Sequence, residues 1–201
     1  MLDWSQTHSK PVRAADAGFA DATGLMVGTP IATAFGWRPV EALCVGDLVL
    51  TFDHSFRPIT GVRRVTLWDG EGDCPAALRP VEVQPGVLPD AGAVTVLPEQ
   101  GVMVESDAAE NYRGDPFAVI APRAIAQYGL AQPVRVSGPL EVIILEFEED
   151  EVIYGQTGLL YHIPKAFDLL SDADPSEVYK VLSADETVDV LSELFEAYLD
   201  A

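Results

Sequence analysis

Between residues 28 and 154 the sequence consists mainly of short segments rich in valine, isoleucine and threonine, each ended by glycine, proline or aspartate. β-Branched side chains fit a pleated strand better than a helix, whereas glycine and proline form turns. The segments predicted as strands are 31–33, 48–52, 62–67, 81–83, 94–96, 102–104, 134–136, 140–147 and 152–154. We therefore expect a mostly β fold with many tight turns.

The polarity pattern within these segments predicts how each strand is buried. Val81 and Val83 alternate with Glu82 and Gln84, which is typical of a strand with one wet face. Residues 142–145 are all apolar, which predicts a strand covered on both faces. The acidic stretch 148–150 between the last two strands is predicted to be a hairpin loop.

Helical signals are sparse before residue 167 and dominate after it. A short helix is predicted at 122–128, with Pro122 in its first turn and Gly129 at its end. Capping signals occur at 174–177 and again at 183–186. Behind the second cap, an apolar stripe at helical spacing is predicted to be buried, comprising Val188, Leu191, Leu194, Phe195, Tyr198 and Leu199. Acidic residues, including Asp185, Glu186, Asp189, Glu193 and Asp200, are predicted to lie largely on other faces.

These patterns divide the chain into three parts. Residues 1–23 show no sustained period and are expected to be a loosely ordered lead-in. Residues 24–168 form the predicted β domain, and residues 169–201 form a C-terminal helical segment. The terminal helix either covers an open face of the β domain or serves as a docking arm, and we expect it to be cover.

Charge and composition exclude several classes of function. The 12 Lys and Arg residues face 32 Asp and Glu residues, so the formal net charge is −20. Such a surface repels nucleic acid and anionic membranes. With 48% hydrophobic residues, the chain is also expected to fold rather than remain disordered. The N-terminus lacks a signal-peptide pattern and no apolar run is long enough to span a membrane, so a cytoplasmic location is expected.

The cysteine, histidine and acidic residues do not form a recognisable catalytic or metal-binding motif in the sequence. Cys44 and Cys74 form neither a disulfide framework nor a zinc pattern, and Cys44 is interpreted as a small apolar plug. His8, His54 and His162 lack paired spacing, so no metal site and no cofactor are predicted. The acidic run 146–151 lacks the alternating ligands of a calcium loop and is interpreted as a solvated hairpin tip. The 70–72 Gly-x-Gly is interpreted as a simple loop because no strand-to-helix context surrounds it.

Residues 24–51 contain a Gly-Thr pair, an Ile-x-Thr strand, Val-Glu-x-Leu and Gly-Asp-x-Val in order. This arrangement resembles the opening of a Hint (Hedgehog/intein) domain. The resemblance continues at 79–88 and 96–104, and the closing segments 142–154 and 161–164 are similar to the bacterial branch of the family. It implies a compact, nearly all-β fold with pseudo-twofold symmetry, which agrees with the strand pattern.

The resemblance also shows where catalytic residues are expected. In the family, a Cys or Ser at the first position attacks the preceding carbonyl, and a Thr/Ser-x-x-His block polarises and protonates the scissile amide. In this sequence the nucleophile position is Gly24, the hydroxyl position is Leu97 and the histidine position is Gln100. The histidine of the closing hairpin corresponds to Asp150. The sequence therefore predicts that the catalytic residues have been lost.

Two functions are consistent with this pattern. The first is a degenerate, non-catalytic Hint-like domain that acts as a binding or structural module. Its former active-site cleft, lined by Gly24, Leu97 and Gln100, would hold a protein or peptide partner. The alternative is an autoprocessing domain with an altered nucleophile. The sequence does not specify an oligomeric state.

Overall fold

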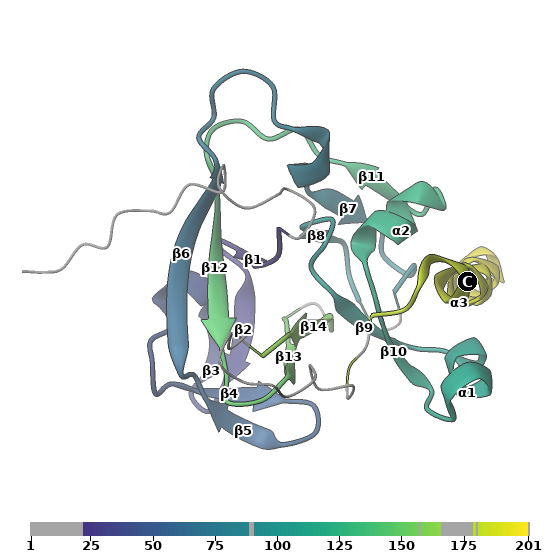
Figure 1. Cartoon of the computed structure of the whole chain (residues 1–201), viewed down its shortest axis with the longest axis horizontal. Helices are drawn as coiled ribbons and strands as arrows, with labels where there is room; N and C mark the ends of the chain where they lie inside the picture. The colour runs from purple at the N-terminus through teal and green to yellow at the C-terminus, as the bar shows by residue number, and fades with distance from the viewer. Residues whose placement is uncertain (1–21, 89–90, 157, 166–178, 180, 201) are drawn as a thin grey trace, which may run out of the picture.

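The computed structural model describes residues 22–88, 91–156, 158–165, 179 and 181–200. The chain is mostly β, as the sequence predicts (Figure 1). The described strands are β1 (Leu25–Met26), β2 (Pro30–Thr33), β3 (Gly36–Pro39), β4 (Leu48–Thr51), β5 (Ser55–Pro58), β6 (Gly61–Trp68), β7 (Val81–Val83), β8 (Val94–Val96), β9 (Val102–Glu105), β10 (Phe117–Ile120), β11 (Ala131–Pro133), β12 (Leu140–Glu146), β13 (Glu151–Tyr154) and β14 (Leu160–Ile163). The α-helices are α1 (Asp107–Arg113), α2 (Pro122–Gln127) and α3 (Ala184–Asp200).

The strands of this part of the chain form three sheets that share one hydrophobic core. The largest sheet has the order β10-β9-β14-β13-β4-β2-β3, with β5 paired to β4. The two smaller sheets have the orders β1-β12-β6 and β11-β7-β8. The long β6 and β12 ribbons lie at one side of the molecule in Figure 1, and the three helices lie at the other. Leu25, Val49, Val83, Val102 and Leu191 belong to one buried cluster, so all three sheets and α3 contribute to the core.

The predicted strand 140–147 is confirmed as β12, the central strand of its sheet. Within the apolar run 142–145, Val142, Ile143 and Leu145 are buried and Ile144 is partly exposed. The predicted strand 134–136 is wrong, because the chain pairs three residues earlier, as β11 on β7. Val134 still donates a hydrogen bond to the carbonyl of Pro80 at 2.8 Å. Proline has no N–H to return a bond, so the ladder ends there.

The predicted short helix at 122–128 is confirmed as α2, with Pro122 at its start. The predicted cap at 183–186 is confirmed as a reciprocal pair. Ser183 N donates to Glu186 Oε2 at 2.9 Å, and Glu186 N donates to Ser183 Oγ at 3.4 Å. The predicted cap at 174–177 and the predicted domain boundary at 168/169 lie outside the described residues.

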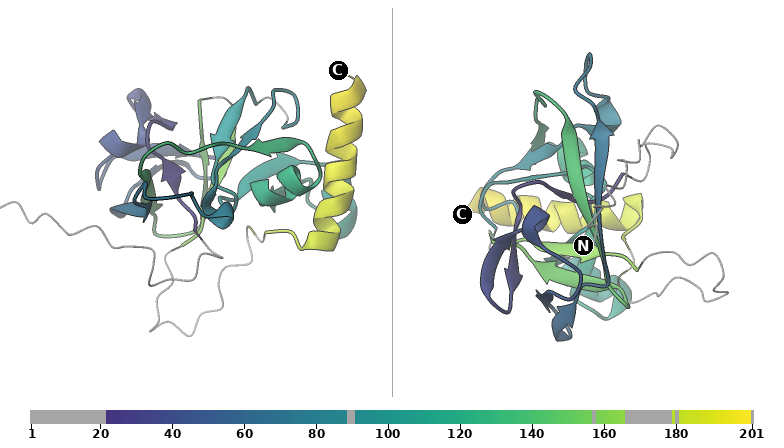
Figure 2. Two further views of the ribbon diagram at one scale, coloured as in Figure 1. Left: turned by 90° about the horizontal axis from the view of Figure 1, so that it is seen from above. Right: turned by 90° about the vertical axis from the view of Figure 1, so that its left-hand side faces the viewer.

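Helix α3 packs along one end of the β domain, as the left view in Figure 2 shows. Val190, Leu191 and Leu194 are buried in the main core. The buried face of α3 is rotated from the predicted apolar stripe, because two residues of that stripe are exposed. Val188 is 49% exposed and Leu199 is 65% exposed. Which stripe is buried depends on the surface that the helix meets, and helical spacing alone does not specify that surface.

Glu193 lies off the buried stripe, as predicted, but its side chain has a structural role that the sequence does not indicate. Its carboxylate accepts hydrogen bonds from Ser106 Oγ at 2.7 Å, Ala108 N at 2.9 Å and Asp107 N at 3.1 Å. These groups form the first turn of α1, a helix that the sequence reasoning missed. Burial raises the pKa of Glu193, but the hydrogen bonds outweigh burial and lower the pKa below its ordinary value. The charged side chain of α3 therefore caps α1.

Replacing a buried residue of α3 is expected to destabilise the whole domain. Leu191→Ala should lower the free energy of unfolding by about 2–5 kcal/mol because it leaves a cavity in the core. Val188→Ala on the exposed face of the same helix should change it by less than about 0.5 kcal/mol. Urea denaturation of the two variants and the parent chain measures both effects. Equal effects would show that α3 does not cover the core.

Candidate functional site

Gly24 lies just before β1, at the point where the chain enters the sheet beside β12. Leu25 pairs with Ile143, which holds the preceding residue against β12. The φ angle of Gly24 is +137°, a backbone conformation that residues with a side chain rarely adopt. A Cβ atom built on Gly24 would lie 3.0 Å from Val142 Cγ2 and 3.1 Å from Val142 Cβ. The local backbone and the neighbouring side chain therefore both favour glycine.

Gln100 lies in the turn between β8 and β9, and its side chain is only 2% exposed. Its Oε1 atom accepts a hydrogen bond from Gly24 N at 3.0 Å. Its Nε2 atom donates to the carbonyl of His162 at 2.7 Å and to that of Gly101 at 3.2 Å. The amide therefore joins the start of β1, the start of β9 and β14. We call these four residues and their three hydrogen bonds the Gln100 junction.

Leu97 begins the same turn, and its carbonyl accepts a hydrogen bond from Gln100 N at 3.2 Å. Its side chain is 1% exposed and packs in an apolar cluster that also contains Val142. Gly24 approaches the same valine. The structure thus brings Gly24, Leu97 and Gln100 together. All three are buried, so they do not line an open groove.

Asp150 lies in the loop between β12 and β13, and its Oδ1 accepts a hydrogen bond from Lys165 N at 2.6 Å. Its link to the Gln100 junction is electrostatic and passes through His162. Burial lowers the pKa of His162, and the negative charge of Asp150 opposes that effect without cancelling it.

His162 is the residue of this region that the sequence reasoning missed. It lies within β14, is buried, and donates its backbone N–H to Gly101 O at 2.9 Å. Its Nε2 atom has no hydrogen-bond partner among the described residues. No strand is predicted at 161–164, yet β14 pairs with β13 and β9 and brings His162 beside Gln100. The predicted hairpin at 148–150 is wrong, because β12 and β13 belong to different sheets.

Comparison with known families identifies the domain that holds these residues. A model of the Hint domain matches residues 23–159, which include Gly24, Leu97, Gln100 and Asp150. The chain belongs to the Hint domain family. No curated protein gives a significant match.

Solved intein structures resemble the fold of this Hint domain. The bacterial intein-like domain from Clostridium thermocellum is 12% identical, with 70% of this chain and 99% of that chain covered and a TM-score of 0.46. The gp41-1 intein is 13% identical, with 69% and 97% covered and a TM-score of 0.41. An AceL NrdHF class 3 split intein is 17% identical, with 73% and 100% covered and a TM-score of 0.37.

The two cysteines of the Hint domain lie in different environments. Cys44 is exposed, so its interpretation as an apolar plug is wrong. Its backbone N–H donates to Asp47 Oδ2 at 2.9 Å, while Val40 and Leu43 fill the core beneath the turn. Cys74 is buried, and burial raises the pKa of its thiol despite the opposing charge of Arg79. A thiol with a raised pKa is a poor nucleophile.

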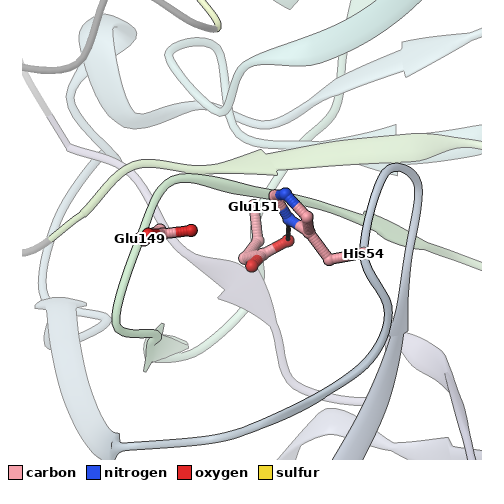
Figure 3. A group of neighbouring side chains, drawn as sticks. All are labelled: His54, Glu149 and Glu151. Carbon is pink, nitrogen blue, oxygen red and sulfur yellow. Dashed lines mark hydrogen bonds and ion pairs between the residues drawn. The ribbon is translucent and has the colours of Figure 1, made fainter.

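A second group of polar side chains comes from the loops at 52–54 and 147–150 and the start of β13. The ligand atoms of His54, Glu149 and Glu151 lie within 4.8 Å of one another (Figure 3). Glu151 is 2% exposed, so the interpretation of the whole run 146–151 as a solvated tip is wrong. Arg57 lies beside both carboxylates, with Nε 3.4 Å from Glu151 Oε1 and Nη2 3.8 Å from Glu149 Oε2.

A hollow of about 340 Å³ lies beside the turn that carries Gln100. Pro98 and Glu99 of that turn form one side, and Arg123 and Ala126 of α2 form another. Arg123 Nη1 pairs with Glu99 Oε1 at 2.6 Å, and both residues line the hollow. Unlike the Gln100 junction, this surface is open to a ligand.

The geometry of the Gln100 junction predicts a large stability cost when the amide is removed. Gln100→Leu leaves Gly24 N and the carbonyl of His162 without this partner, at about 1–3 kcal/mol for each buried group. We expect a loss of about 2–6 kcal/mol, measured by urea denaturation. Gln132→Leu, at an exposed position of β11, is the matched control and should change stability by less than about 0.5 kcal/mol. Similar values for both variants would contradict the proposed role of the buried amide.

Proposed function

We propose that this Hint domain does not cleave itself and acts as a non-catalytic binding or structural module. The observation that carries the proposal is the state of the family's nucleophile position. Gly24 has no side chain that can attack a carbonyl. Its backbone conformation and its contact with Val142 also disfavour any residue that could.

The positions that correspond to the family's Thr/Ser-x-x-His block support the same conclusion. Autoprocessing needs a group that polarises the scissile carbonyl and a proton donor for the leaving amide. Leu97 offers neither, because its side chain is apolar and packed in the core. Both amide hydrogens of Gln100 are donated to backbone carbonyls. The side chains at these positions therefore stabilise the fold and have no group available for proton transfer.

An autoprocessing domain with an altered nucleophile is the alternative. Cys44 is the exposed thiol among the described residues, and Thr23 directly precedes Gly24. Such a mechanism would have to assemble an activated nucleophile without help from the positions of Leu97 and Gln100. Because catalytic groups of this kind work as a set, residual activity from a single remaining member would be small.

The partner we propose is a protein or an extended peptide rather than nucleic acid or a membrane surface. The formal net charge of −20 disfavours polyanions. The hollow beside Pro98 has the volume of a small binding site, and it carries the guanidinium groups of Arg79 and Arg123 on a mostly acidic protein. Arg123 is already paired with Glu99, so Arg79 is the group that would favour a segment bearing a carboxylate. Among the described residues, no helix is long and apolar enough to cross a membrane.

The absence of self-cleavage is directly testable by mass spectrometry. Purified protein should retain its full mass of 21.6 kDa during long incubation with dithiothreitol or hydroxylamine at neutral pH. An active intein treated in parallel controls for the reagents, and the urea-denatured chain controls for nonspecific hydrolysis. A fragment ending at Thr23 that grows with time only in the folded sample would support the autoprocessing alternative instead.

A further inference from the structure

We propose that His54, Glu149 and Glu151 bind one divalent transition-metal ion, zinc in the first instance. This inference is independent of the proposed function. His54 belongs to the turn between β4 and β5, Glu149 lies in the loop after β12, and Glu151 is the first residue of β13. Figure 3 shows the imidazole directed at Glu151, with the carboxylate of Glu149 on the other side of Glu151.

The distances already suit a shared ion. His54 Nδ1 lies 3.2 Å from Glu151 Oε2. Two ligand atoms bound to one tetrahedral zinc at roughly 2.0–2.2 Å are about 3.3–3.6 Å apart. Glu149 must approach slightly from its present position within 4.8 Å, and its exposed side chain has room to do so. Little rearrangement is needed to complete three protein ligands.

The charge balance of the group favours an added cation. Glu151 is buried, and a buried carboxylate needs a compensating charge and hydrogen bonds. His54 Nδ1 already makes one hydrogen bond to its Oε2 atom, whereas Oε1 faces Arg57. Arg57 supplies charge at 3.4 Å, but its buried Nε atom makes no hydrogen bond. The arginine therefore compensates the charge of Glu151 at a distance without an aligned hydrogen bond. A divalent ion would supply twice the charge and a direct bond, while the partly exposed Arg57 turned toward solvent.

The donor types select among metals. One imidazole nitrogen with two carboxylate oxygens suits zinc and similar first-row divalent ions, with a water molecule in the remaining position. Calcium prefers six to eight oxygen ligands, and magnesium prefers octahedral oxygen coordination with several waters. The histidine therefore favours a transition metal over either of these ions.

An ion would fix two loops that are far apart in sequence. Residues 51 and 153 pair where β4 meets β13, and the proposed ligands lie just beyond this pairing, after the end of β4 and at the start of β13. Coordination would join the β4–β5 turn to the β12–β13 loop. Zinc should therefore raise the melting temperature of the folded chain by mass action.

The alternative is that the group is only an ion-pair network, and Arg57 distinguishes the two interpretations. In a metal site, Arg57 competes with the ion for the same carboxylates, so Arg57→Gln should strengthen zinc binding. In a structural network, Arg57→Gln removes the compensating cation, and no specific zinc binding appears.

The experiment is calorimetric titration of Zn²⁺ into the full-length, chelator-treated chain, with the visible absorption of bound Co²⁺ reporting the geometry. We expect one saturable site. His54→Asn and Glu149→Gln should each weaken it by at least about tenfold, since both remove a ligand. Both positions are exposed, which favours folded variants.

Glu148→Gln in the same loop and His8→Asn near the N-terminus are the matched controls and should leave binding unchanged. Zinc should also raise the melting temperature of the parent chain, but not that of His54→Asn. No saturable binding, or binding that survives both ligand substitutions unchanged, would overturn the proposal. Binding that Arg57→Gln weakens would also overturn it.

Discussion

The three buried hydrogen bonds of the Gln100 side chain connect segments that are far apart in the sequence. They also hold Gly24 in a buried position. The amide accepts from Gly24 N, 76 positions away, and donates to the carbonyl of His162, 62 positions away. Each such bond adds only about 1 kcal/mol, but a buried backbone group left without a partner costs more. The Gln100 junction therefore ties the entry of the chain to β9 and β14. It occupies the place where the family's chemistry would be expected.

The apolar packing around the Gln100 junction also keeps Gly24 and its neighbours buried. Val142 approaches Gly24 on one side and shares the cluster of Leu97 on the other. A hydroxyl at position 97 would be buried in that cluster, where it would need a hydrogen-bond partner. A self-cleaving site at these positions would thus require more than one substitution, because glycine, leucine and glutamine pack and hydrogen-bond with one another. This interdependence is the physical basis for proposing a module without self-cleavage.

Much of the fold could be predicted from the sequence because its signals are local. The apolar run 142–145 became the covered strand β12, and Ser183 with Glu186 formed the predicted cap. The missed features depend on contacts distant in sequence. Val190 rather than Val188 is buried because of the surface that α3 meets, and Glu193 is held by α1. Glu151 lies in an acidic run that reads as solvated, yet His54 and Arg57 pair with it from another hairpin.

For the site, the family resemblance located Gly24, Leu97 and Gln100, whereas the role of Gln100 and the proximity of His162 required the structure.

Amide hydrogen exchange at Gly24 tests the central claim most directly, because this N–H is the group that Gln100 holds. In a closed, structural junction it should exchange as slowly as the amide of Ile143 in the neighbouring strand, which opens only with the domain. In an open site that admits a nucleophile or water, it should exchange as fast as the amide of Gly72 in an exposed loop. The account predicts the slow rate at Gly24, and the fast rate would contradict it.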